Sequence, residues 1–170
     1  MKRRSIWFSS DFSVLQRYVL SMLVLGGIVI ATLMVCFMIA LNIVRETERH
    51  MDRGTVFLSQ GRFEESLENF ENVLKSNPRR KLAWAGKGLC LMSLGRYYEA
   101  LAHYEKALVI YPDYAVAWLG KGMSYEYLGN YKDALVCFDK AHEILPEYGL
   151  VIKLQSRVMK KLNTSRYSIQ

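Results

Sequence analysis

The sequence predicts an all-α protein in which one long apolar helix is followed by a stack of paired helices, an α-solenoid. The prediction depends on an uncharged run over 18–44 and on three prolines, Pro78, Pro112 and Pro146, that lie 34 residues apart. A repeat of 20–50 residues indicates units that stack on one another. With 170 residues, of which 51% are hydrophobic and 23% charged, the composition excludes a disordered chain and a protein with many membrane spans.

The uncharged run is almost wholly apolar from Tyr18 to Leu41. A helix over this stretch would be roughly 36 Å long, enough to cross a hydrocarbon core of about 30 Å. A cleaved secretory signal would have an apolar core of about 7–15 residues and small residues at its cleavage site. This run is longer and ends Ala40-Leu41-Asn42 without that pattern. We therefore expect a signal anchor, a single transmembrane helix over 18–44.

Basic residues flank this run on both sides. Four precede it and three follow it: Lys2, Arg3, Arg4 and Arg17, then Arg45, Arg49 and Arg53. Because basic residues are more frequent on the cytoplasmic side, we expect the basic N-terminal tail, residues 1–17, to be cytoplasmic and the domain after the run to be extracytoplasmic. Gly27 and Ala31 have a spacing that lets membrane helices associate, so a homo-oligomer is compatible with the run.

The prolines divide residues 47–148 into three units, 47–80, 81–114 and 115–148. Four other columns then fall into register: Gly54, Gly88 and Gly122; Gly61, Gly95 and Gly129; Phe63, Tyr97 and Tyr131; Phe70, Tyr104 and Phe138. In each unit a turn such as Leu94-Gly95-Arg96 separates two amphipathic stretches, and glycine tolerates the left-handed backbone at a helix end. We expect each unit to form two helices.

The pattern of these units resembles the tetratricopeptide repeat (TPR). The residues that carry the resemblance are Trp84, Gly88, Leu91, Ala100, Tyr104, Ala107 and Pro112 in the second unit, and Trp118, Gly122, Tyr125, Ala134, Phe138, Ala141 and Pro146 in the third. The resemblance implies a three-repeat TPR α-solenoid with a concave groove that binds proteins. The first unit departs from the family pattern, with His50 in place of Trp and Ser66 and Val73 in place of Ala.

Two further features concern the packing of the array. Residues 149–163 carry Val151, Leu154 and Val158 at helical spacing, which resembles the capping helix of TPR arrays and leaves 164–170 as a tail. Position 7 of each unit, usually leucine in the family, is Arg53, Lys87 or Lys121. We expect these side chains to lay their stems along the packing face and to send their charges into solvent.

Carrying the family's groove positions onto this chain implies a partner-binding groove. Its residues are Met51, Thr55, Leu58, Leu82, Ala85, Leu89, Met92, Val116, Leu119, Met123, Glu126 and Tyr127. The middle of this surface is apolar, which favours an apolar helix or extended segment of a partner protein. An alternative is that the chain's own C-terminal helix, or a second copy of the chain, fills the groove.

TPR domains that clamp the C-terminal carboxylates of chaperones carry Lys, Asn and Arg in this groove. This chain has Met51, Thr55, Gly86, Val116 and Gly120 at the matching positions. We therefore do not expect a carboxylate clamp.

The remaining residues do not assemble a reactive site. His50, His103 and His142 are scattered without metal-site spacing, and Cys36, Cys90 and Cys137 lie too far apart for a zinc ribbon. We expect no enzyme activity, no metal and no cofactor. The net charge of +7 divides into +3 over 1–17, −1 over the repeats and +5 over 149–170, so nucleic acid is not the expected partner.

These observations together predict a membrane-anchored protein-interaction module that acts as a scaffold, assembly factor or chaperone-like adaptor. The alternative is a receptor that recognises targeting segments in protein transport. An enzyme is the least favoured class because no catalytic set converges in the sequence.

Overall fold

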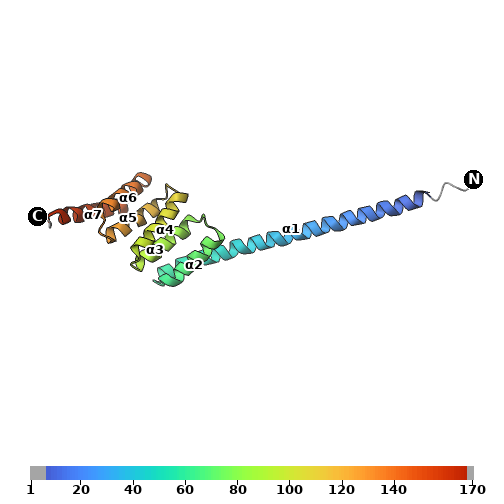
Figure 1. Cartoon of the computed structure of the whole chain (residues 1–170), viewed down its shortest axis with the longest axis horizontal. Coiled ribbons are helices and arrows are strands. Elements are labelled where there is room, and N and C mark those ends of the chain that lie inside the picture. The colour runs from blue at the N-terminus through green and yellow to red at the C-terminus, as the bar shows by residue number, and fades with distance from the viewer. Residues whose placement is uncertain (1–6, 168–170) are drawn as a thin grey trace, which may run out of the picture. The chain divides into compact units, whose positions relative to one another are not determined.

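The computed structural model describes residues 7–167, with side-chain surroundings over 16–164. The ends of the two expected tails, 1–6 and 168–170, lie outside the described residues. Seven helices and no strand make up the described part of the chain (Figure 1). They are α1 (Trp7–Ser59), α2 (Phe63–Ser76), α3 (Lys81–Ser93), α4 (Tyr97–Ile110), α5 (Ala115–Tyr127), α6 (Tyr131–Ile144) and α7 (Gly149–Tyr167). The all-α architecture is confirmed.

The chain divides into two compact units, residues 1–45 and 46–170. The described part of the first unit is the stretch of α1 up to Arg45, whose large apolar side chains between Tyr18 and Val44 are all exposed. In the described residues, one stretch, Gln16–Ser59, is long and apolar enough to cross a membrane, by length and composition.

The second unit is a stack of helix pairs. The last part of α1, from Glu46 onward, pairs with α2; α3 then pairs with α4, and α5 with α6. From α2 to α7 each helix contacts the next one in the chain, and α3 also contacts α5 (Figure 1). The first helices of the three pairs therefore form one layer, and the second helices form the other.

Each turn inside a pair has the same backbone geometry. Gly61, Gly95 and Gly129 have φ of 74°, 75° and 77°, which glycine adopts without strain. After the first of these glycines, the Arg62 N–H donates to the Phe57 carbonyl at 2.9 Å, and the turns after Gly95 and Gly129 repeat this bond. This 6→1 bond ends the first helix in a Schellman motif.

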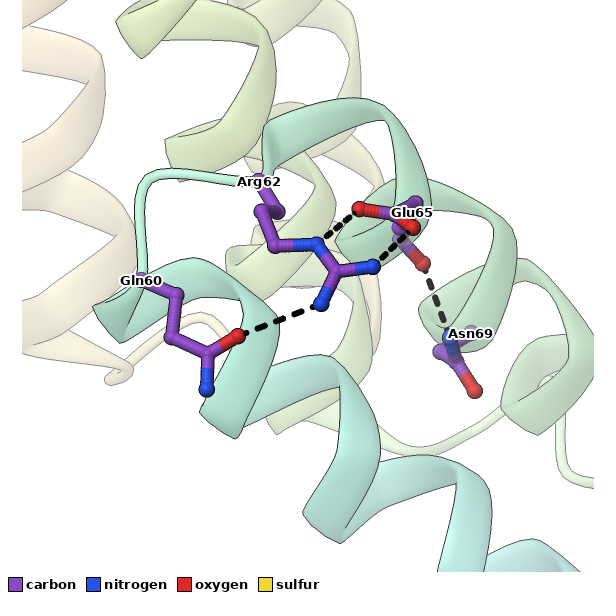
Figure 2. Close-up of polar contacts among 4 residues, drawn as sticks. All are labelled: Gln60, Arg62, Glu65 and Asn69. Atoms are coloured by element: carbon purple, nitrogen blue, oxygen red, sulfur yellow. Dashed lines mark hydrogen bonds and ion pairs between the residues drawn. The ribbon is translucent and has the colours of Figure 1, made fainter.

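An exposed ion pair follows the turn in the first two pairs. In Figure 2 the Arg62 guanidinium reaches both Glu65 and Gln60, and the Asn69 amide donates to the Glu65 carbonyl at 2.8 Å. The hydrogen bond from Arg62 lowers the pKa of the Glu65 carboxyl. Exposed pairs of this kind add little stability, so the glycine geometry is the main determinant of the turn.

The stack is held together by aromatic rings from the second helices that lie against glycines of the first helices. A Cβ at Gly88 would lie 2.7 Å from the Tyr104 ring, and a Cβ at Gly120 would lie 2.3 Å from it. Phe70 is in the same position between Gly54 and Gly86. Each ring thus contacts the first helix of its own pair and the first helix of the next pair.

A hydrogen bond explains why a tryptophan follows six residues after the proline of the preceding unit. The indole N–H of Trp84 donates to the Pro78 carbonyl at 2.8 Å, and Trp118 donates to Pro112 at 2.7 Å. The first pair has no proline before it, and its His50 instead lies 3.0 Å from the Asn69 side-chain oxygen.

For two of the three basic residues at position 7, the stems pack as expected, but the charges pair with carboxylates of the neighbouring helix pair. The side chains of Lys87 and Lys121 are only 14% and 16% exposed. The Lys121 ammonium pairs with Glu105 at 2.9 Å, and the Lys87 ammonium lies 4.0 Å from Glu71. Each carboxylate is exposed and comes from the second helix of the preceding pair, so the two ammonium groups link neighbouring pairs at the surface of the stack.

Helix α7 packs on the last pair through Val151, Leu154 and Val158, which are buried with Phe138. Its position is also set by a buried carboxylate on α5, Glu126, which accepts hydrogen bonds from Arg157 at 2.6 Å and from Lys161 at 2.9 Å. Burial raises the pKa of Glu126, but these hydrogen bonds outweigh burial, so the pKa lies below its ordinary value.

The fit of the Tyr104 ring is tested by Gly120→Ala. The new methyl group would overlap a buried ring, and we expect the free energy of unfolding to fall by about 1–3 kcal/mol. Urea denaturation of the full chain in detergent micelles, followed by circular dichroism, measures this change. At Gly149 a Cβ would meet nothing within 4 Å, so Gly149→Ala should not destabilise the protein. Equal stability of the two variants would contradict the packing described.

The docking of α7 is tested by Glu126→Gln, which removes the charge shared by Arg157 and Lys161. Hydrogen bonds to charged groups contribute about 1.5–3 kcal/mol, so we expect faster amide exchange over 151–158. The matched control is Glu143→Gln, whose exposed pair with Lys140 should contribute almost nothing.

The protection of α7 from amide exchange should also depend on pH through Glu126. Because the folded pKa of Glu126 is lowered, its contribution is complete above the unfolded value of about 4.3 and is lost as the pH falls through the folded pKa. Protection of α7 should therefore fall in acid in the native chain and depend less on pH in Glu126→Gln. Identical pH profiles in the two proteins would overturn this role.

Candidate functional site

The candidate site is an open apolar cavity of about 320 Å³ in the second unit. Its walls come from α1, α3 and α5, its floor from α2 and α4, and one residue from the turn before α5. The lining residues are Met51, Thr55, Leu58, Phe70, Leu82, Ala85, Gly86, Leu89, Met92, Tyr104, Tyr114, Val116, Leu119, Gly120 and Met123. We call this cavity the groove.

The structure brings together most of the residues predicted for the groove. Those that line it are Met51, Thr55, Leu58, Leu82, Ala85, Leu89, Met92, Val116, Leu119 and Met123. Glu126 and Tyr127 do not line it. Glu126 is buried under α7 by its ion pairs, and Tyr127 stacks on Tyr97 with ring centroids 5.0 Å apart.

Phe70, Tyr104 and Tyr114 line the groove but were not predicted, and Gly86 and Gly120 were placed in it only as positions that match those of a carboxylate clamp. Phe70 and Tyr104 belong to second helices, and their rings reach the groove because Gly86 and Gly120 have no side chain to cover them. The column of aromatic residues beside glycines could have given this signal. Tyr114 had no sequence signal.

The groove residues differ in the fraction of the side chain that is exposed to a ligand. Met51, Ala85 and Met92 are almost fully buried, whereas Leu82 is 48% exposed, Leu89 38% and Val116 52%. The aliphatic side chains of α3 and α5 are therefore the accessible part of the groove.

No charged side chain lines the groove in the described part of the chain. The Thr55 hydroxyl donates to the Asp52 carbonyl at 2.8 Å, within its own helix. The hydroxyls of Tyr104 and Tyr114 are the other side-chain polar groups of the lining, and burial raises the pKa of both. The groove can thus bind apolar groups and has two hydroxyls for hydrogen bonding.

A basic hollow of about 420 Å³ adjoins the groove at Leu82, which lines both. Asn77, Arg79, Arg80, Lys81 and Tyr111 complete its lining. Arg80 pairs with Glu48 at 2.8 Å. The Lys81 ammonium lies 5.1 Å from the centre of the Tyr111 ring, within the range of a cation–π contact. We call this hollow the basic edge.

The chain's own α7 does not line the groove over its described side chains. It packs at one end of the array, where Leu119 and Met123 contact the cluster that contains Val151 and Leu154. The described C-terminal helix therefore covers the end of the groove surface and leaves the part between α1, α3 and α5 open.

Two titratable groups outside the groove, His103 and Cys137, lie in the packing between helices. His103 stacks on Trp84, and burial, with Lys87 and Lys106 nearby, lowers its pKa to about 4. Burial raises the pKa of the Cys137 thiol to about 11. Among the described residues, no group of three or more His, Cys, Asp or Glu could hold a metal ion.

Comparison with solved structures finds the same fold in other proteins. The yeast Sti1 TPR2B domain, in complex with pHsp70, aligns with a TM-score of 0.65 and 17% identity over 69% of this chain and 98% of that chain. The second TPR domain of human RPAP3, in complex with the HSP70 peptide SGPTIEEVD, aligns with a TM-score of 0.65 and 19% identity over 69% and 98%. The TPR domain of Aspergillus fumigatus Sgt2 aligns with a TM-score of 0.69 and 16% identity over 74% and 84%.

Sequence comparison gives the family. No curated relative matches the sequence. Two family models, each described as the tetratricopeptide repeat, match residues 51–115 and 115–148. These two matches span the three helix pairs described above, and with them the chain belongs to the tetratricopeptide repeat family.

Proposed function

We propose that this chain is a membrane-anchored protein-interaction module whose groove binds an apolar peptide or helix of a partner protein. It would act as a scaffold, assembly factor or chaperone-like adaptor. The observation that carries the proposal is the groove itself, an uncharged cavity with Leu82, Leu89 and Val116 half-exposed around it.

A partner that covers these side chains gains binding free energy, because it removes their apolar surface from water. Removing apolar surface from water gains roughly 25 cal/mol per Å², and exposed apolar surface of this kind commonly marks an interaction site. Methionines such as Met92 and Met123 add surface that adapts to different apolar shapes.

The groove does not suit an acidic peptide such as SGPTIEEVD, the HSP70 peptide in the complex of the human RPAP3 domain. That peptide is a ligand of the human protein, and the similarity of this chain to the human domain is one of fold. Here Met51, Thr55, Gly86, Val116 and Gly120 stand where a carboxylate clamp needs basic and amide side chains. A carboxylate in the groove would lose its hydration without gaining an ion pair.

The groove is tested by photo-crosslinking in intact cells. A photoreactive residue in place of Leu82 of the full chain should capture a partner protein, and Leu89→Glu should reduce the yield at least tenfold because it puts a charge among apolar side chains. The matched control is Val109→Glu, at a position of α4 that is 83% exposed and does not line the groove. Equal capture by both variants, or no captured protein, would contradict the proposal.

Membrane anchoring is supported by the long apolar stretch of α1. The proposal puts the N-terminus in the cytoplasm and the repeats on the extracytoplasmic side. Alkaline phosphatase fused after Gln170, expressed in a bacterial inner membrane, should then be active, because it folds only outside the cytoplasm, and the fusion should resist extraction by alkaline carbonate. An inactive phosphatase together with a fluorescent green fluorescent protein fusion at the same position would reverse the orientation.

A further inference from the structure

The Tyr104 hydroxyl is a polar group that the packing of the repeats does not require. The equivalent ring is Phe70 in the first unit and Phe138 in the third. Tyr104 is 2% exposed and lines the groove, and a Cβ at Gly120 would lie 2.6 Å from its hydroxyl oxygen. Over the described residues, this hydroxyl makes no hydrogen bond.

Tyr114 brings a second hydroxyl to the same cavity, and it too has no hydrogen-bond partner in residues 16–164. A ligand that fills the groove removes these hydroxyls from water, and a polar group buried without a partner costs about 1–3 kcal/mol, so a ligand that supplies an acceptor is favoured over one that does not. The apolar face of a helix supplies none, because its carbonyls already bond within the helix. An extended segment offers free backbone carbonyls.

The basic edge adds a charge preference next to this apolar surface. Arg80 is neutralised by Glu48, but no described carboxylate pairs with Arg79 or Lys81. Both residues line the hollow that shares Leu82 with the groove. In the turn before α5, 34 residues later, the equivalent positions are Asp113 and Ala115. This pair of basic residues is therefore not repeated there. An acidic side chain beside an apolar stretch complements this arrangement.

On the basis of the proposed function, we infer that the occupant of the groove is an extended apolar segment of a partner protein. A backbone carbonyl of this segment accepts a hydrogen bond from the Tyr104 hydroxyl. An acidic side chain at one end of the segment lies between Arg79 and Lys81.

The experiment uses the full chain in lipid nanodiscs and two displayed libraries of 12-residue peptides. One library is linear, and the other is held helical by a side-chain bridge between residues i and i+4. Binders that also bind the Val116→Glu variant are discarded, because they do not depend on the groove. The linear library should yield apolar peptides with Asp or Glu toward one end, and the helical library should yield none.

Two variants then test the contacts. Tyr104→Phe should lower the affinity for the selected linear peptides about 2- to 10-fold. Replacing one peptide amide by an ester should lower the affinity by a similar factor. The two changes together should lower it no further, because both weaken the same hydrogen bond. The Tyr104→Phe variant has the residue of the other two units, so its midpoint of unfolding should be unchanged or raised. The double variant Arg79→Gln and Lys81→Gln should weaken binding by a factor that shrinks as salt is added.

The outcomes separate the inference from the proposed function. If helical peptides bind the groove and Tyr104→Phe does not change their affinity, the inference that the occupant is extended is wrong. The proposed function would still stand. Linear peptides without an acidic residue, or without sensitivity to Arg79 and Lys81, would overturn the inferred chemistry of the partner. If neither library yields a peptide that depends on Val116, the proposed function itself is wrong.

Discussion

The packing of one aromatic ring between two glycines is the contact on which the second unit depends. Tyr104 lies against Gly88 in its own helix pair and against Gly120 in the next pair, and Phe70 does the same one unit earlier. Because a Cβ at either glycine would overlap the ring, the helices can approach only when both glycines are present. The ion pair between Lys121 and the exposed Glu105 adds a polar contact across the same junction.

The same contact shapes the groove. The glycines that admit the rings leave no side chain over them, so Phe70 and Tyr104 form part of the floor while the aliphatic side chains of α3 and α5 form the walls. After the last pair the pattern changes, and Leu154 of α7 is buried with Phe138. The array therefore ends in an apolar cap held by Glu126, and the apolar surface that stays open lies between α1, α3 and α5.

Much of this fold could be predicted because its contacts repeat with the sequence. The glycine, aromatic, tryptophan and proline columns each correspond to a contact that recurs 34 residues later, and the predicted helix pairs, turns and most of the groove follow from them. Contacts that do not repeat were not predictable. Glu126 is buried by its ion pairs with Arg157 and Lys161, which lie in the helix after the last repeat and have no counterpart in the other units.

We expect a partner segment to lie on the apolar groove between α1, α3 and α5. The decisive measurement is a structure of the full chain cross-linked to its captured partner. In that structure the segment should contact Leu82, Leu89 and Val116 and pass over the Tyr104 hydroxyl. A partner bound to the outer face of α4 and α6, or to the exposed side of α7, with the groove empty, would contradict it.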